Sequence, residues 1–487
     1  RSETKEWPVH KTLPKREGVT FAAGDLLGGG APVIISFYYL IFLTDVVGLR
    51  PSLAGLVVLI SRIWDAISDP LMGVITDNTR GRMGRRKPYF LAGSIGIVIA
   101  YVLLWNPIAT ANMAWRFAYV LFSYLFYSTI QTMVMVPYSA MSAEISMDYT
   151  ERNWVNGLRL MFSTAATAVS ALVPLEIVRL FSSVRTGYLV MALIFGVFFA
   201  IPFLLIALTA KERVPAPDER SQFDLSLFIA PLKIRSFRLL VGIYVSCYLA
   251  IDVVSAVFAY YMNYYLVRPG ELNYVIGALL VVPVFLVPLV VHLANRVGKA
   301  KTISLFVLIW AAGLIVLSFL TPAWPAWAIY AVAFVIGCGV IGGIVIPWLM
   351  YPDTTDVGEL ELGKRVSGSF SGIMTLMRKT AGAIGIFVVS TVLEFAGYVP
   401  PVTEMIGGGS REQMFAQPEG VLVALRIVVA VVPLVLIVVI LILARRYPIS
   451  KEISERLTTL LERLRGTGSP VDEETRQEME ELRRELV

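Results

Sequence analysis

Two acidic side chains in the middle of one long apolar segment have the most specific chemistry in this sequence. Asp65 and Asp69 stand four residues apart in the segment 52–78, and Arg62 precedes Asp65 by three residues. On a helix these side chains share one face. Two carboxylates buried one turn apart repel each other, so a positive charge must neutralise them.

Two arrangements would supply that charge. Arg62 could pair with one carboxylate and brace the helices, which is a structural role only. Alternatively, a monovalent cation or a proton binds between Asp65 and Asp69, with the hydroxyl of Ser68 as a further oxygen ligand. Hard cations prefer such oxygen ligands. The spacing favours the coupling-cation site.

Other ionisable residues inside apolar segments are candidates for a substrate pathway, because such residues are unfavourable in a membrane unless they function. Lys379 could reach the carboxylate pair, or its ammonium group could extend to the membrane interface. Arg159 is a similar candidate. Asp252 could bind a substrate hydroxyl or a proton, or it could hydrogen-bond a neighbouring helix. Asp25 and Glu394 lie nearer segment ends and are assigned no role.

Charged residues also gather beside the ends of two apolar segments. At the end of the segment 52–78, an acid is followed by a run of basic residues. After the segment 325–352, several acids are followed by basic residues. Such pairs can form and break as two halves of a transporter rock. For the basic run alone, the alternative is the ordinary positive charge of cytoplasmic loops. The predicted cytoplasmic gate consists of Asp77, Arg82, Arg85, Arg86, Asp353, Asp356, Glu359 and Arg365.

The composition shows what kind of protein must position these residues. Of 487 residues, 56% are hydrophobic and 16% charged, whereas a soluble domain has about 25% charged residues. Two cysteines exclude a disulfide scaffold, and two histidines leave too few ligands for a His/Cys metal site. The sequence has no Walker loop, nucleophile elbow or zincin helix, so we expect no enzyme and no cofactor.

Long apolar runs predict an all-α integral membrane protein, since one span needs about 20 apolar residues. The twelve predicted spans are 20–47, 52–78, 88–106, 113–145, 153–180, 186–210, 237–266, 273–296, 300–321, 325–352, 366–397 and 419–446.

Basic residues are concentrated in the loops after spans 2, 8 and 12, which predicts that both termini are cytoplasmic. The long polar stretch after span 6 divides the spans six and six, which is the layout of a major facilitator transporter. The predicted regions are a cytoplasmic N-terminus (1–19), an N-terminal half (20–210), a linker (211–236), a C-terminal half (237–446) and an amphipathic helical tail (447–487). The tail is either a solvated helix pair or a partner-binding element.

Several strings resemble the glycoside–pentoside–hexuronide:cation symporter family. They are Phe42–Leu49, Arg62–Gly73, Gly84–Pro88, Val136–Ala140, Asp353–Glu359 and Arg378–Lys379. The resemblance implies a cation site at Asp65 and Asp69, with Ser68 in place of the family's Asn and with Thr132 from span 4. It also implies that Lys379 lies near that site and that Arg159 lines the substrate pathway.

The sequence departs from the sugar carriers of that family at two places. The melibiose symporters bind sugar hydroxyls through one Asp in span 1 and one in span 4, and these positions correspond here to Gly29 and Met135. A second branch of the family transports lysophospholipids with sodium. This chain is similar to that branch at Gly29–Pro32, at Val136–Ala140 and around Trp348.

We therefore expect a secondary active symporter that works by alternating access, coupled to sodium, with lithium and the proton not separable. The expected solute is a sugar or glycoside, and the alternative is a lysophospholipid or another amphiphile. A non-transporting membrane sensor or scaffold is the alternative of another class, although a scaffold has no need to bury two acids. We expect a monomer in the bacterial inner membrane, with lipid but no nucleic acid as a partner.

Overall fold

The structure, a computed structural model, describes residues 13–81, 83–106, 108, 110, 112–146, 149–212, 229–362, 367–406, 409–413, 416–466 and 473–486. Across these ranges, twelve helical segments are long and apolar enough to cross a membrane. The predicted all-α membrane fold is confirmed. The chain divides into two compact units, each taken by itself below.

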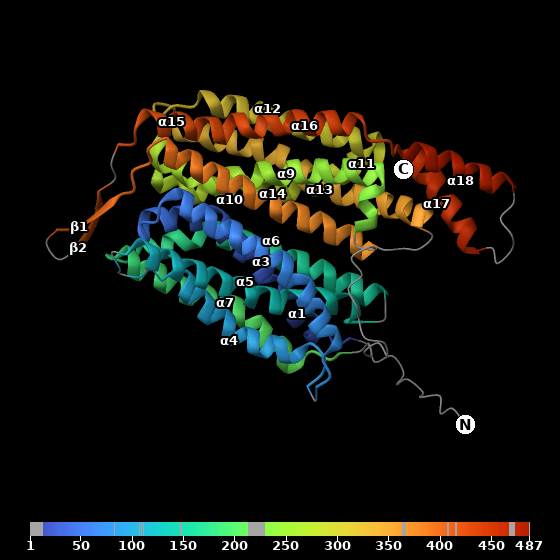
Figure 1. Cartoon of the computed structure of the whole chain (residues 1–487), viewed down its shortest axis with the longest axis horizontal. Helices are drawn as coiled ribbons and strands as arrows, with labels where there is room; N and C mark the ends of the chain where they lie inside the picture. Colours follow the sequence, from blue (N-terminus) through green and yellow to red (C-terminus); the bar gives the residue numbers. More distant parts are fainter. Residues whose placement is uncertain are drawn as a thin grey trace. The chain divides into compact units, whose positions relative to one another are not determined.

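Unit 1 comprises Arg1–Ile35, Ile63–Phe223 and Thr403–Glu412. In it, α4 packs along α5 and α7, and α2 packs along α6 (Figure 1). Its helices are α1 (Lys15–Ala22), α2 (Asp25–Ile34), most of α3 (Pro51–Asn78), α4 (Lys87–Leu104), α5 (Met113–Glu144), α6 (Tyr149–Arg179) and α7 (Val184–Thr209).

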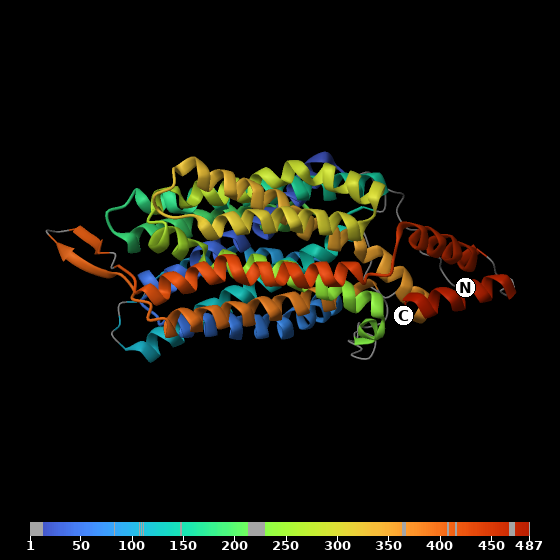
Figure 2. The ribbon, with the colours of Figure 1, turned by 90° about the horizontal axis from the view of Figure 1, so that it is seen from above.

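Unit 2 comprises Ser36–Arg62, Asp224–Val402 and Gln413–Val487. Its α-helices are the start of α3, α9 (Arg235–Tyr260), α10 (Leu272–Val281), α11 (Val287–Val297), α12 (Lys299–Phe319), α13 (Ala326–Leu362), α14 (Ser367–Phe395), α15 (Glu419–Arg426), α16 (Val432–Arg445), α17 (Lys451–Gly466) and α18 (Glu473–Leu486). Figure 2 shows α16 beside α12, with α17 and α18 at one end of this unit.

Short helices of other types complete the chain. The π-helical turns are η1 (Ile35–Tyr39), η2 (Phe42–Val46), η4 (Tyr261–Tyr265) and η7 (Ile427–Val431), and the 3₁₀ turns are η3 (Ala230–Lys233), η5 (Pro269–Glu271) and η6 (Val282–Leu286). A hairpin of β1 (Val402–Ile406) and β2 (Gly409–Gln413) separates α14 from α15. The sequence analysis did not anticipate this hairpin.

The tenth span ends later than expected. The sequence predicts an end at residue 352, but α13 continues to Leu362. Pro352 lies inside this helix, and the Thr355 hydroxyl donates to the Pro352 carbonyl at 2.7 Å. A proline removes only the bond to the carbonyl four residues earlier, and the helix continues on both sides of it here. The acids after residue 352 therefore lie on a helix instead of in a loop.

Glycines allow the closest helix crossings. A Cβ on Gly339 of α13 would lie 2.3 Å from the backbone nitrogen of Trp310 in α12. A Cβ on Gly29 of α2 would lie 2.2 Å from the carbonyl oxygen of Ser163 in α6. Both separations are far below van der Waals contact, so these helices cross where only glycine fits.

The first and seventh spans end in the same backbone turn. Both η2 and η4 are π-helical. Each residue of η4 corresponds to the residue of η2 that lies 219 positions earlier in the chain. Each turn ends with two backbone hydrogen bonds, the first to the carbonyl five residues earlier and the second to the carbonyl six residues earlier. The bonds are Val47 N to Phe42 O, 3.0 Å, and Leu49 N to Leu43 O, 2.9 Å, in one turn, and Leu266 N to Tyr261 O, 2.9 Å, and Arg268 N to Met262 O, 2.8 Å, in the other.

One position in this repeated turn has a left-handed backbone in both copies. Gly48 has φ 72° and its counterpart Val267 has φ 57°. Glycine adopts this region freely, whereas a β-branched residue is strained there. The second copy therefore stores strain that the first avoids.

We predict that Gly48→Val lowers the stability of the protein and that Val267→Gly raises it, each by about 1–2 kcal/mol, the penalty for a side chain in this region. Val267 is 64% exposed, so its removal sacrifices little packing. Unfolding midpoints of the purified variants in one detergent would measure both effects. A lower midpoint for Val267→Gly would contradict the assignment of strain.

Candidate functional site

The predicted carboxylates Asp65 and Asp69 face α5 within unit 1. Asp65 is buried, and its carboxylate accepts a short hydrogen bond from the Ser128 hydroxyl. One turn further along both helices, Thr132 Oγ1 donates to Asp69 Oδ1 at 2.7 Å. Two carboxylates of α3 are thus matched by two hydroxyls of α5.

A third hydroxyl lies beside the pair. Among the described residues, Ser68 Oγ is buried and has no hydrogen-bond partner. A buried hydroxyl without a partner is unfavourable, so the Ser68 oxygen is a candidate ligand for a cation. Carboxylate and hydroxyl oxygens suit a hard monovalent cation, whereas the described residues contain no cluster of three His, Cys, Asp or Glu side chains for a transition metal.

Ser128 was missed by the sequence analysis, which took only Thr132 from span 4. A signal was present, since Ser128 and Thr132 stand four residues apart, as Asp65 and Asp69 do. Two helices with matching spacing can pair residue by residue over one turn. Arg62, three residues before Asp65, belongs to unit 2, where it interacts electrostatically with Asp252.

Arg159, a predicted pathway residue, lies at the centre of a second polar cluster in unit 1. Its Nε is 3.2 Å from Asp25 Oδ2, and both side chains are about 15% exposed. The same Nε donates to Tyr138 Oη at 3.1 Å, and the guanidinium lies over the Tyr138 ring. Nη1 donates to Asn156 Oδ1 at 3.0 Å. Asp25, to which the sequence analysis assigned no role, is therefore the ionic partner of Arg159.

Gly29 and Met135 border this cluster. A Cβ on Gly28 would lie 3.0 Å from the Met135 Cε atom and 2.7 Å from Asp25 Oδ1. Gly29 is closed by Ser163, so an aspartate cannot enter position 29 while α2 and α6 keep this crossing. Asp25, one turn earlier on α2, is the nearest carboxylate on that helix.

In unit 2, Asp252 pairs with Arg378 of α14, with 3.6 Å between Oδ1 and Nη2. The Arg378 guanidinium lies 4.1 Å from the centre of the Tyr248 ring. Trp348 of α13 is 41% exposed and contacts Tyr244 edge to face at 5.6 Å. Lys379 follows Arg378 on α14. Each unit therefore holds an aspartate–arginine pair whose guanidinium lies on a tyrosine ring.

Of the predicted gate residues of the first half, Asp77 lies at the end of α3, and Arg85 and Arg86 lie directly before α4. Asp77 Oδ1 is 3.6 Å from Arg86 Nη2, and Arg86 is almost fully buried. Glu212, which the sequence analysis missed, accepts the backbone N–H groups of Arg85, Arg86 and Lys87 at 2.8, 2.7 and 3.3 Å. A carboxylate that accepts the first N–H groups of a helix stabilises that end, here the start of α4. Arg82 lies outside the described residues.

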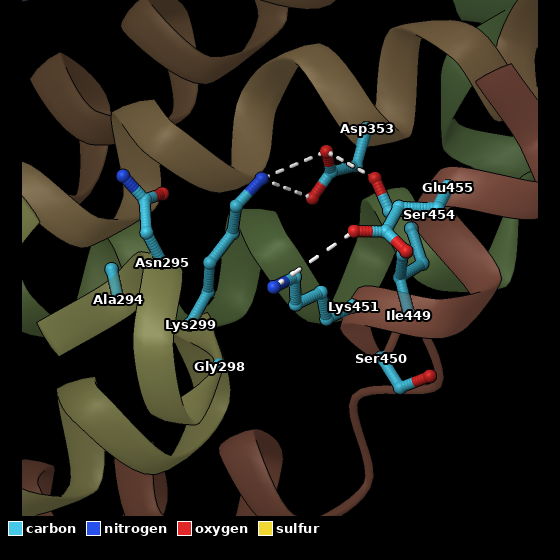
Figure 3. A pocket seen from close by; sticks show the side chains of 10 residues that line it. All are labelled: Ala294, Asn295, Gly298, Lys299, Asp353, Ile449, Ser450, Lys451, Ser454 and Glu455. Atoms are coloured by element: carbon cyan, nitrogen blue, oxygen red, sulfur yellow. Dashed lines mark hydrogen bonds and ion pairs between the residues drawn. The ribbon is translucent and has the colours of Figure 1, made fainter. Parts of the chain in front are cut away.

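Asp353 is bound from two sides in unit 2 (Figure 3). Lys299 Nζ donates to both carboxylate oxygens at 2.8 and 2.6 Å, and Ser454 of α17 donates at 3.1 Å. These residues line a cavity of about 280 Å³. Asp356 and Glu359 lie on the next turns of α13, and Arg365 lies outside the described residues.

The C-terminal helices also bind α13. Arg483 Nη2 donates to the Leu360 carbonyl at 2.8 Å, and Arg483 Nε lies 3.4 Å from Glu361 Oε2. Leu457 and Leu482 are buried. The apolar faces of α17 and α18 are therefore covered within unit 2.

We predict that Arg159→Ala and Asp25→Ala each destabilise the protein by roughly 1–3 kcal/mol, because each leaves a part-buried charge without its partner. The double variant should lose less than the sum, since both single losses come from one interaction. Unfolding midpoints of the three variants measure the coupling. Strictly additive losses would show that the pair contributes no shared energy.

Known proteins match this chain over most of its length. A family model described as MFS/sugar transport protein matches residues 20–451. The isoprimeverose transporter of Lactiplantibacillus pentosus is 24% identical, over 80% of this chain and 82% of its own. The sodium-dependent lysophosphatidylcholine symporter 1 of Gallus gallus is 24% identical, over 87% of this chain and 85% of its own.

A solved structure supports the fold alone. It comes from work on substrate recognition in proton dependent oligopeptide transporters and is 12% identical, with a TM-score of 0.63 over 89% of this chain and 98% of that one. The twelve spans in the described residues and the family match over residues 20–451 make the protein a multi-pass membrane transporter, which is not an enzyme class. The chain belongs to the MFS/sugar transport protein family.

Proposed function

We propose that this protein is a sodium-coupled symporter whose cation binds between α3 and α5 in unit 1. The observation that carries the proposal is the double pairing of Asp65 with Ser128 and of Asp69 with Thr132, beside the unpartnered Ser68 hydroxyl. Two carboxylates in a membrane span need a cation or a proton to be stable. The relatives named symporters are consistent with this role.

Coupling follows from that electrostatic requirement. A bound cation neutralises the pair and fixes α3 against α5, which prepares the solute pathway. If the cation raises the affinity for the solute, the solute must raise the affinity for the cation by the same factor. Two six-helix halves that rock about the site would then carry both across the membrane.

For the solute we propose a sugar or glycoside. The Gly29 and Met135 positions have no carboxylate, but Asp25, Arg159, Tyr138 and Asn156 form one polar cluster beside them. Carboxylate, guanidinium and amide groups together donate to and accept from hydroxyls, as sugar binding requires. Asp25 would supply, one turn earlier, the acceptor that position 29 lacks.

A second solute class is favoured by a different observation. Met135 places an apolar side chain against Gly28, and Arg159 could bind a phosphate. One relative carries the name sodium-dependent lysophosphatidylcholine symporter. A lysophospholipid or a similar amphiphile is therefore the alternative solute.

The remaining features of the proposal concern the setting. Both termini would lie in the cytoplasm, which the basic loops after spans 2, 8 and 12 support through the positive-inside rule. A bacterial inner membrane and a monomer are the setting we propose. The charged ends of α3 and α13 would form and break ion pairs there during transport.

We predict that Asp65→Asn and Asp69→Asn each weaken sodium stimulation of uptake at least about tenfold, because each removes half of the charge that attracts the cation. Ser128→Ala should weaken it less. Thr129→Val is the matched control, because Thr129 accepts from Trp64 on the same pair of helices without touching a carboxylate. Uptake by proteoliposomes against sodium concentration measures all four. Full sodium stimulation in Asp69→Asn would contradict the site.

We predict that purified protein in proteoliposomes accumulates a labelled sugar or glycoside from a panel when an inward sodium gradient is imposed. Replacing sodium by choline should abolish accumulation, while lithium and an acid-outside gradient test the other ions. A labelled lysophospholipid tests the second solute class. Accumulation of neither class under any cation gradient would contradict the proposed function.

A further inference from the structure

A buried group of hydroxyls surrounds one carboxylate at an end of unit 2. Asp45, in η2, accepts from Tyr264 Oη at 2.5 Å, from Tyr398 Oη at 2.5 Å and from Thr44 Oγ1 at 2.6 Å. Thr44 Oγ1 also lies 2.7 Å from Tyr260 Oη. We name these five residues, Thr44, Asp45, Tyr260, Tyr264 and Tyr398, the Asp45 latch.

The hydroxyl-bearing residues of the latch are buried, and Asp45 itself is half-buried. Thr44 and Tyr260 are fully buried, and Tyr264 and Tyr398 are each 8% exposed. Burial, and then the charge of Asp45, raise the pKa of Tyr398. Its phenol therefore keeps its proton and acts as a donor to the carboxylate. Hydrogen bonds to an ionised acceptor are about twice as strong as neutral ones.

The chain topology gives the latch its significance. Residues 36–62 belong to unit 2, whereas the chain before residue 36 and the chain directly after residue 62 belong to unit 1. Residues 36–62, which hold η1, η2 and the start of α3, are therefore packed with the residues of unit 2. Two further contacts hold this segment: Ser52 N donates to Glu394 Oε2 at 2.9 Å, and a Cβ on Gly55 would lie 2.8 Å from Ser390 Cβ.

The latch lies at the opposite end of α12 from the Lys299–Asp353 pair. Tyr261 and Tyr265, in the same turn as Tyr264, donate to the carbonyls of Leu317 and Leu320 at the C-terminal end of α12. Lys299 begins that helix, which has 21 residues and so spans about 30 Å. This distance is the thickness of the membrane core. The two sets of contacts therefore belong to opposite membrane faces.

The two repeated π turns meet in the latch. Asp45 and Tyr264 are corresponding positions, 219 residues apart, and they bond directly to each other. π turns are common at functional sites, and the strained Val267 follows the second one. The two repeated turns are therefore joined directly, through equivalent positions.

We propose that the Asp45 latch is the gate on the membrane face opposite Lys299 and Asp353, and that its hydroxyl–carboxylate bonds set the balance between closed and open gate. This inference rests on the proposed function, because a gate that opens and closes has a role only in a transporter. For a solute to enter from that face, the segment 36–62 must move away from Tyr260, Tyr264 and Tyr398.

Spin-label distances test the gate without any solute. Labels are placed at Arg50→Cys and Gly270→Cys, with Cys247→Ala and Cys338→Ala removing both native thiols. Arg50 is exposed, and a Cβ on Gly270 meets nothing within 4 Å. Tyr264→Phe/Tyr398→Phe removes two donors while keeping both rings. We expect the population with the longer distance to grow about tenfold or more.

Tyr265→Phe is the matched control, because Tyr265 lies in the same turn but donates to the Leu320 carbonyl at the end of α12 and not to the segment 36–62. Its distance distribution should match that of the parent. An unchanged distribution in the double variant, or an equal shift in the control, would overturn the proposal. The distance measurements require neither sodium nor sugar. If the uptake assay fails, they still test the gate separately from the proposed function.

Discussion

Burying two carboxylates one turn apart in a membrane span is the constraint on which this structure depends. Asp65 and Asp69 need hydroxyl donors and a positive charge, since lipid supplies neither. Helix α5 meets half of that need through Ser128 and Thr132. In our proposal a cation from solution binds there as well, and its binding couples transport to the cation gradient.

Other carboxylates in the helices are held by side chains of the protein itself. Asp25 has Arg159, Asp252 has Arg378, and Asp353 has Lys299 and Ser454. Pairs of this kind are stable without a solute but can exchange partners when one binds. At the Asp45 latch, hydroxyls from three separate segments donate to one carboxylate.

Much of this architecture could be predicted from the sequence. Apolar runs long enough to cross a membrane predicted twelve spans. The four-residue spacing of Asp65 and Asp69 predicted that they share one helix face. Asp25 was passed over because it lies near a span end, and only the packing of α2 on α6 brings Arg159 to it. Ser128, Glu212 and the latch tyrosines depend on which helices are neighbours, which periodicity within one helix does not encode. The extension of α13 past Pro352 was missed because a proline usually marks a helix end.

The central claim is that the Asp65–Asp69 pair binds a cation and that this binding is coupled to the solute. Calorimetric titration of sodium into purified protein, with and without the sugar identified by uptake, measures this directly. The account predicts that the sugar tightens sodium binding by the same factor by which sodium tightens sugar binding. Sodium binding of equal affinity with and without the sugar, or no sodium binding at all, would contradict it.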